Sequence, residues 1–284
     1  MASAANKVAG LTSLGSAADK RYSLNLQNGD RMKLLINLFV IAIALLIPSA
    51  VSAVDNELFN DLISKIRFKD YAQVEKFLES NKPSLASYPE YYVLLLNYVI
   101  SKGDKTGIVV AKGTPNGDDL SLTSKESGEV VGFLGTRGGY DEELIVNGIT
   151  DTQKALKSFN SRLDIHFGIV SVAARIERLD IVGNQLKKIL EDSIKLDNKW
   201  IWGPINSMDG DPKEFMIQNV VSNTSLLFRA NTKQADEALT SVSETLVKLY
   251  PNEIYGYANL GTLCLAQKEY DCAEQYYNHA LKLF

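Results

Sequence analysis

The end of the chain constrains its fold more than any other segment, because it carries two apolar helical faces in quick succession. The stretch from Ile254 to Phe284 reads IYGYANLGTLCLAQKEYDCAEQYYNHALKLF. Two small residues, Gly261 and Ala273, stand where a pair of antiparallel helices would have to approach each other closely. One such hairpin cannot bury its apolar face alone. The segment therefore predicts stacked helical neighbours upstream.

The same segment resembles a tetratricopeptide repeat. Leu260-Gly261 matches the Leu-Gly pair of that family's first helix, and Pro251 stands where a preceding repeat would end. The family's remaining aromatic and small positions are matched by Tyr257, Tyr270, Ala273, Tyr277 and Ala280. Weaker echoes of the same rhythm, without the Leu-Gly pair, occur at Phe68–Leu78 and Ile176–Val182.

The resemblance implies a mainly α protein, a right-handed α-solenoid whose first helices line a concave groove for peptides or partner helices. On the matched repeat, the groove side would present Tyr255, Asn259, Thr262 and Ala266. Asn259 is the strongest polar candidate, because an amide can both donate to and accept from a peptide backbone. A hydrogen bond within its own hairpin is the alternative role. The basic residues of the family's carboxylate clamp cannot be traced in the sequence.

A second feature is the apolar run Leu34–Ile47, LLINLFVIAIALLI, which follows Lys33 and precedes Pro48. A basic start, an apolar core and small residues at a cut site are typical of a signal peptide. We expect one over residues 32–53, cleaved after Ala53, which predicts a periplasmic or secreted protein. An uncleaved membrane anchor is the alternative, and it is the only contact with a membrane that the sequence suggests.

Residues 1–31 are polar and of low complexity, so they are either a disordered extension or the product of a start assigned too early, with Met32 the true start. Removing residues 1–53 takes away five basic and two acidic residues and leaves a net charge of −7. An acidic surface repels phosphate backbones, so nucleic acid is not expected as a partner.

The periodicity of the remaining chain predicts helical hairpins over 54–102, a glycine-rich β insert over 103–149 and helical repeats over 150–284, the clearest at 254–284. In the first part we expect two helices within 55–80, the second ended by Asn81-Lys82-Pro83, and a third over 89–101. Short β-prone runs at 107–111, 120–123, 129–134 and 143–146 predict a small antiparallel insert of two to four strands. Further helices are predicted at 151–162, 165–177, 179–196, 213–230, 234–249, 254–267 and 270–283.

Two cysteines, Cys264 and Cys272, fall on the two helices of the closing hairpin. The helical pattern places them about one turn out of register, whereas a disulfide needs Cα atoms within about 7 Å. We therefore expect two buried thiols acting as small apolar residues, with a disulfide as the alternative.

Catalytic and metal-binding patterns are absent from the sequence. His166 and His279 match no ligand spacing, and His166 is expected to pack in the core. No serine or cysteine lies in a nucleophile motif, and the glycines of 132–139 lack the Lys-Ser/Thr pair of a phosphate loop. Asp209, Asp211 and Glu214 are better explained by the start of a helix at Pro212 than by a cation. We expect no metal, no cofactor and no enzyme activity.

A loop around 198–212 carries both tryptophans, Trp200 and Trp202. They either cap the helical stack or form a lip that faces a ligand. Together these patterns predict a non-catalytic scaffold that binds a protein or peptide through its helical repeats. The alternatives are a structural subunit packed into an envelope assembly and, third, an enzyme whose site forms only in space.

Overall fold

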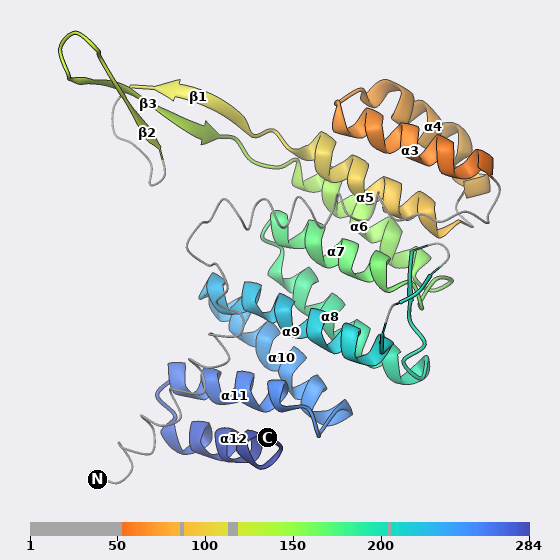
Figure 1. Cartoon of the computed structure of the whole chain (residues 1–284), viewed down its shortest axis with the longest axis vertical. Coiled ribbons are helices and arrows are strands. Elements are labelled where there is room, and N and C mark those ends of the chain that lie inside the picture. The colour runs from red at the N-terminus through yellow and green to blue at the C-terminus, as the bar shows by residue number, and fades with distance from the viewer. Residues whose placement is uncertain (1–52, 86–87, 113–118, 204–205, 209) are drawn as a thin grey trace. The chain divides into compact units, whose positions relative to one another are not determined.

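The computed structural model describes residues 53–85, 88–112, 119–203, 206–208 and 210–284 (Figure 1). Apart from Ala53, the predicted signal peptide and everything before it lie outside these residues. The described chain forms two compact units: an N-terminal unit, Val54–Ala155, and a C-terminal unit, Leu156–Phe284. No helix in the described part of the chain combines the length and apolar character needed to cross a bilayer.

In its described residues the N-terminal unit contains four helices, α3 (Ala53–Arg67), α4 (Tyr71–Leu85), α5 (Pro89–Gly103) and α6 (Glu142–Ala155). The first three confirm the predicted helices, but Asn81-Lys82-Pro83 was wrongly predicted to end the second, which continues to Leu85.

Side chains on all four helices join them into one core. The rings of Phe59 on α3 and Phe77 on α4 meet edge to face, with 6.3 Å between their centroids. The hydroxyl of Tyr98 on α5 donates a 2.8 Å hydrogen bond to Glu75 on α4. On α6, Gly148 lies so close to Val99 that a Cβ there would stand 2.7 Å from a valine methyl group. Helices α5 and α6 therefore pack as a tight hairpin.

The β insert interrupts this hairpin as a projecting arm. Strands β1 (Gly107–Ala111), β2 (Leu120–Thr123) and β3 (Val130–Arg137) form an antiparallel sheet in the order β1-β3-β2. The pairing of β1 with β3 continues to the helices through a bridge between Asp104 and Tyr140. Figure 1 shows the sheet extending away from α5 and α6. The insert thus leaves the helices and returns to them at one point.

The sheet has three strands, within the predicted two to four, and the β-prone run 143–146 is not one of them, because these residues lie at the start of α6. Asp141 accepts a hydrogen bond from the backbone N–H of Leu144, which caps the helix. Ile145 and Ile149 are then buried on one face at helical spacing. A four-residue apolar run does not distinguish a strand from the first turn of a buried helix.

The C-terminal unit contains three further hairpins. Their helices are α7 (Leu163–Arg175), α8 (Leu179–Lys195), α9 (Pro212–Ala230), α10 (Lys233–Leu249), α11 (Ile254–Ala266) and α12 (Tyr270–Lys282). A two-stranded sheet of β4 (Ile201–Trp202) and β5 (Asn206–Ser207) lies between α8 and α9 in the chain. These six helices confirm the predicted ones to within a few residues, whereas 156–162, predicted as helix, are turn and loop.

Small residues lie where these helices cross. A Cβ at Gly183 on α8 would stand 2.6 Å from the Cβ of Ala238 on α10. A Cβ at Gly261 on α11 would stand 3.0 Å from the ring of Tyr277 on α12. Ala273 is 4% exposed and is the buried residue of α12. The close approach predicted at Gly261 and Ala273 is confirmed, since both lie in the α11–α12 contact.

Three hairpins, one in the N-terminal unit and two in the C-terminal unit, turn in the same way. A residue with positive φ joins their helices: Lys69 (60°), Glu177 (57°) and Lys268 (63°). In each turn this residue donates to a carbonyl three residues back, and the next residue donates to one five residues back, which is a Schellman motif. The first buried residue of the second helix follows five residues later: Val74, Val182 and Ala273.

Candidate functional site

A left-handed residue in the turn sets a register in which the first helices of the last two hairpins can be compared. Counting back 13, 9, 6 and 2 residues from Lys268 gives the predicted groove positions on α11: Tyr255, Asn259, Thr262 and Ala266. The turn between α9 and α10 also has a left-handed residue, Asn231, with φ of 47°. The same count on α9 gives Gln218, Ser222, Ser225 and Arg229. We call these eight residues the first-helix surface.

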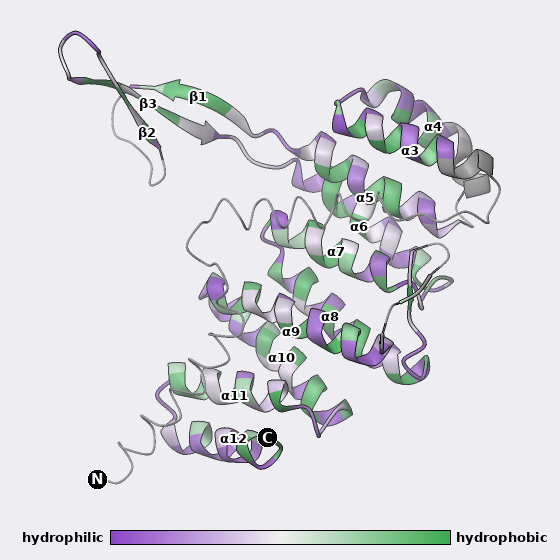
Figure 2. Ribbon diagram, in the orientation of Figure 1, coloured by the Kyte–Doolittle hydropathy of each residue, from purple (hydrophilic) through white to green (hydrophobic). Residues whose placement is uncertain are grey.

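Exposure supports this register. All four α9 positions are exposed, while the apolar residues between them, such as Val220 and Leu227, are fully buried. On α11, Thr262 and Ala266 are exposed and Tyr255 and Asn259 are half-buried. Figure 2 shows hydrophilic and hydrophobic residues interspersed along α9. The surface is therefore accessible, rich in hydroxyl and amide groups, and carries one charge, that of Arg229.

One hydrogen bond joins Asn259 of the first-helix surface to α9, and Thr262 bonds within its own hairpin. The Asn259 amide donates to the Thr224 hydroxyl on α9 over a long 3.4 Å. The Thr262 hydroxyl donates to the carbonyl of Ala258 at 2.8 Å and lies 2.9 Å from the hydroxyl of Tyr277. Asn259 thus bonds to the preceding hairpin. The alternative predicted from the sequence was a bond within its own hairpin. Its amide retains further hydrogen-bonding capacity, because it offers two N–H groups and a carbonyl.

The two tryptophans belong to the core more than to a surface. Trp200 is 3% exposed and meets the ring of His166 edge to face, with 5.5 Å between the centroids. The ring of half-buried Trp202 lies between Phe167 of α7 and Phe215 of α9, at 6.4 and 5.2 Å. Trp200 was therefore wrong as a candidate for partner binding, and the loop packs onto α7 and α9.

His166 is a buried packing residue, as expected, and it is held in one tautomer. Its Nε2 lies 3.1 Å from the carbonyl oxygen of Asn160, which can only accept, so Nε2 carries the proton. Its Nδ1 then accepts from the amide of Gln185 at 2.7 Å. Burial lowers the pKa of His166 to about 4, although the bond to Asn160 opposes the shift. The ring is thus neutral and fully hydrogen-bonded.

An Arg-Leu-Asp-Ile sequence occurs twice, directly before and within the first turns of α7 and α8. Arg162 donates from Nε and Nη2 to both carboxylate oxygens of Asp164, at 2.9 and 2.8 Å. Arg178 binds Asp180 in the same way, at 2.9 and 2.7 Å. The first pair is buried and the second is about one-third exposed. The bond from Arg178 lowers the pKa of Asp180.

Buried polar groups near the end of α8 fasten α8 to α10. The Tyr250 hydroxyl donates to Asn198 at 2.6 Å and lies 2.6 Å from the hydroxyl of Ser193. Asp192 is 3% exposed. Burial raises the pKa of its carboxyl, but hydrogen bonds from Lys188 and Lys195 outweigh burial, so the net effect is a lowered pKa. Each of these groups has a structural partner, so they do not point to acid–base chemistry.

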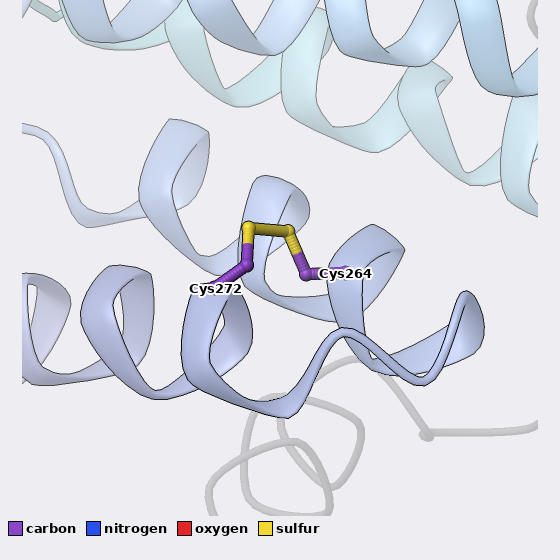
Figure 3. The surroundings of a disulfide bond; sticks show 2 residues. All are labelled: Cys264 and Cys272. Atoms are coloured by element: carbon purple, nitrogen blue, oxygen red, sulfur yellow. A yellow bond between two sulfur atoms is a disulfide. The ribbon is translucent and has the colours of Figure 1, made fainter.

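The cysteines overturn one prediction. Cys264 on α11 and Cys272 on α12 form a disulfide, with 5.8 Å between their Cα atoms (Figure 3). Two separate thiols were expected because the pattern placed the residues a turn out of register. The Schellman turn at Lys268 folds the start of α12 back onto the last turn of α11, which removes that offset. Cys272 is also half-buried, where a buried residue had been expected.

The described elements define the class of the molecule: a mainly α-helical protein with a small antiparallel sheet. Comparison with protein-family models, with curated proteins and with solved structures finds no match.

Sequence reasoning missed the α9 half of the first-helix surface. Its residues are Gln218, Ser222, Ser225 and Arg229, and α9 lacks the Leu-Gly pair that drew attention to α11. The polar period in the sequence is weak, because Asn219, Asn223 and Thr224 are also polar and lie between these positions. Reading it as a surface required the turn at Asn231, which fixes the register between hairpins.

Proposed function

We propose that this chain is a non-catalytic, tetratricopeptide-like scaffold that binds an extended peptide segment of a partner protein across its first-helix surface. The observation that carries the proposal is the common register, because counting from Asn231 and Lys268 aligns four exposed polar residues of α9 with two exposed and two half-buried residues of α11. A right-handed solenoid would continue such a stripe from one hairpin to the next.

The chemistry of the stripe suits a peptide backbone. Gln218 and Asn259 offer amides that can bond a peptide N–H and C=O together, and Ser222, Ser225 and Thr262 offer hydroxyls. An extended peptide needs such groups along its whole length, since its own strand-like backbone leaves donors and acceptors unpaired. The guanidinium of Arg229 adds a site for one carboxylate of the peptide.

We further propose that the protein works outside the cytoplasm. The signal-like segment 32–53 supports export, and the disulfide between Cys264 and Cys272 fits an oxidising compartment such as the periplasm. The partner is then a protein of the cell envelope or exterior.

A peptide array that covers envelope proteins, probed with the full chain, tests this function. Peptides that bind are then titrated by fluorescence anisotropy against Arg229→Ala and Asn259→Ala. We expect each substitution to raise Kd by about fivefold or more, since each removes a group that bonds the ligand directly.

Matched controls lie on the second helices. Lys248→Ala removes an exposed cation from α10, and Asn278→Ala removes an exposed amide from α12. Both should leave Kd within about twofold, because neither lies on the first-helix surface. If the controls weaken binding as much as the test variants, or if no peptide binds, the proposed surface is wrong.

One observation favours the rival function, a structural subunit of an envelope assembly. The arm exposes large aliphatic side chains: Ile108, Val110, Leu120, Val130 and Val131. Exposed apolar clusters of this kind often mark contacts between proteins. An assembly subunit would lose its place in the complex when the arm is removed, whereas a peptide scaffold would still bind its peptide.

A further inference from the structure

The closing hairpin brings three metal-ligating side chains together. One ligand atom from each of Cys264, Glu269 and Cys272 lies within 4.8 Å of the other two. Two thiolates and a carboxylate are ligands that Zn²⁺ accepts. This grouping is independent of the first-helix surface and of the proposed function.

The turn that closes the hairpin assembles the cluster. Cys264 lies in the last turn of α11, and the backbone N–H of Glu269 donates a 2.8 Å hydrogen bond to its carbonyl. Cys272 lies in the first turn of α12, three residues after Glu269. Glu269 precedes α12 without using its side chain as a cap. Its exposed carboxylate therefore lies beside both sulfurs and is not engaged in capping the helix.

We propose that, when Cys264 and Cys272 are reduced, they and Glu269 form a binding site for a thiophilic divalent cation such as Zn²⁺. A small thiol reductant first cleaves the disulfide, which gives two cysteine thiols and the oxidised reductant. Each thiol then loses a proton as its sulfur bonds the metal, and Glu269 binds through a carboxylate oxygen. Because the same two sulfurs form the disulfide, oxidation and metal binding exclude each other.

The backbone spacing suits both states. Zinc bonds sulfur at about 2.3 Å, so two thiolates in a tetrahedral site lie about 3.8 Å apart. Cα atoms 5.8 Å apart allow this separation by small rotations of the two side chains. The carboxylate would supply the third ligand at about 2.0–2.2 Å and water the fourth. The site is thus open at one position.

Titration of the reduced full chain with Co²⁺ tests the site, because cobalt bound to thiolates in a tetrahedral site absorbs characteristically. Competition with Zn²⁺ then gives the zinc affinity. We expect one ion per chain and no such absorption from the oxidised chain. Affinity should rise with pH, since binding releases protons. Binding of cobalt by the oxidised chain with the same spectrum would overturn the proposal.

Variants identify the ligands. Cys264→Ser should abolish the thiolate absorption, and Glu269→Gln should weaken zinc binding about tenfold or more. Glu274→Gln, an exposed carboxylate on α12, is the matched control and should change affinity by less than about twofold. Equal affinity of Glu269→Gln and the native chain would exclude the three-ligand site.

A kinetic measurement does not depend on the folding of any variant. The reduced chain is treated with a small disulfide oxidant, and formation of the Cys264–Cys272 bond is followed with and without Zn²⁺. Zinc should slow oxidation about tenfold or more, because metal-bound sulfurs are not free thiolates. An unchanged rate at saturating zinc would contradict the site.

Discussion

At the scale of single residues, the two Arg-Leu-Asp-Ile segments place the same side chains in different surroundings. Asp164 and Arg162 are almost completely buried, whereas Asp180 and Arg178 are about one-third exposed. Within each pair, two hydrogen bonds join the guanidinium to the carboxylate. The two pairs therefore have nearly the same geometry and differ mainly in burial. Comparing variants of the two pairs therefore measures how much the burial of a charge costs in free energy of unfolding.

We predict that Asp164→Asn lowers the free energy of unfolding by about 3–5 kcal/mol, because it leaves the Arg162 guanidinium buried without a counter-charge. Asp180→Asn should cost about 1 kcal/mol or less, since water reaches Arg178. Urea denaturation of both variants measures the difference. Equal losses would show that the hydrogen-bond fork, and not burial of the charge, determines stability.

His166 predicts a pH dependence. Its pKa is about 4 in the folded chain and about 6.5 in the unfolded chain, so the unfolded chain binds the additional proton between these values. Stability should therefore fall as pH decreases from about 6.5 towards 4, by roughly 3 kcal/mol in total. Urea denaturation at pH 7.5, 6.5, 5.5 and 4.5 measures this slope.

A variant of His166 assigns that slope. His166→Gln should flatten it between pH 5 and 6.5, because it removes the group whose pKa burial lowers. His166→Gln will be less stable at every pH, because the core loses a packed ring, but a slope does not depend on that offset. An unchanged slope in His166→Gln would assign the pH dependence to other groups.

At the scale of elements, the crossing of α8 and α10 depends on Gly183. Alanine there would bring its Cβ within 2.6 Å of Ala238, so the two helices would have to separate. We predict that Gly183→Ala lowers stability by about 1–2 kcal/mol, because overpacking outweighs the gain of up to about 1 kcal/mol in helix propensity. Thermal denaturation would show the loss.

Ala238→Gly tests this explanation in the same protein. In the Gly183→Ala background it removes the clashing methyl group, so the double variant should regain part of the lost stability. The double-mutant cycle should then give a favourable coupling of about 0.5–2 kcal/mol. Additive losses would mean that the two positions do not contact each other.

The helical hairpins could be predicted from the sequence because their apolar spacing repeats over several turns, and the three strands of the arm because glycine-rich turns separate them. The run 143–146 could not be recognised as helical, because four residues do not define a period. The disulfide was not predicted because the left-handed turn at Lys268 sets the offset between Cys264 and Cys272. This turn occurs at a residue with no strong preference for that conformation. Predicting the α9 half of the first-helix surface required the register between hairpins, which only the structure provides.

At the scale of the whole molecule, the arm is attached to the α5–α6 hairpin at one point, where Asp104 and Tyr140 are paired. We predict that replacing residues 105–139 with a short Asn-Gly turn leaves the melting temperature within about 3 °C, because the tight contact of Gly148 with Val99 lies outside the arm. Binding of a hydrophobic dye should fall, since Ile108, Val110 and Leu120 are removed.

A large loss of melting temperature would instead show that the sheet supports the helices. Circular dichroism separates this outcome from simple misfolding, because the helical signal should persist in the shortened chain. The same variant distinguishes the two functions: peptide binding by the first-helix surface should survive, whereas incorporation into an assembly through the arm should be lost.

The Schellman turns have a consequence for engineering. Lys69, Glu177 and Lys268 are exposed and hold a left-handed conformation that glycine adopts without steric cost. Glycine at these three positions, one in the N-terminal unit and two in the C-terminal unit, should therefore raise stability by removing the cost of the left-handed conformation. Three substitutions to glycine at solvent-exposed turn positions should thus make the protein more heat-resistant, while every core residue and the first-helix surface stay unchanged.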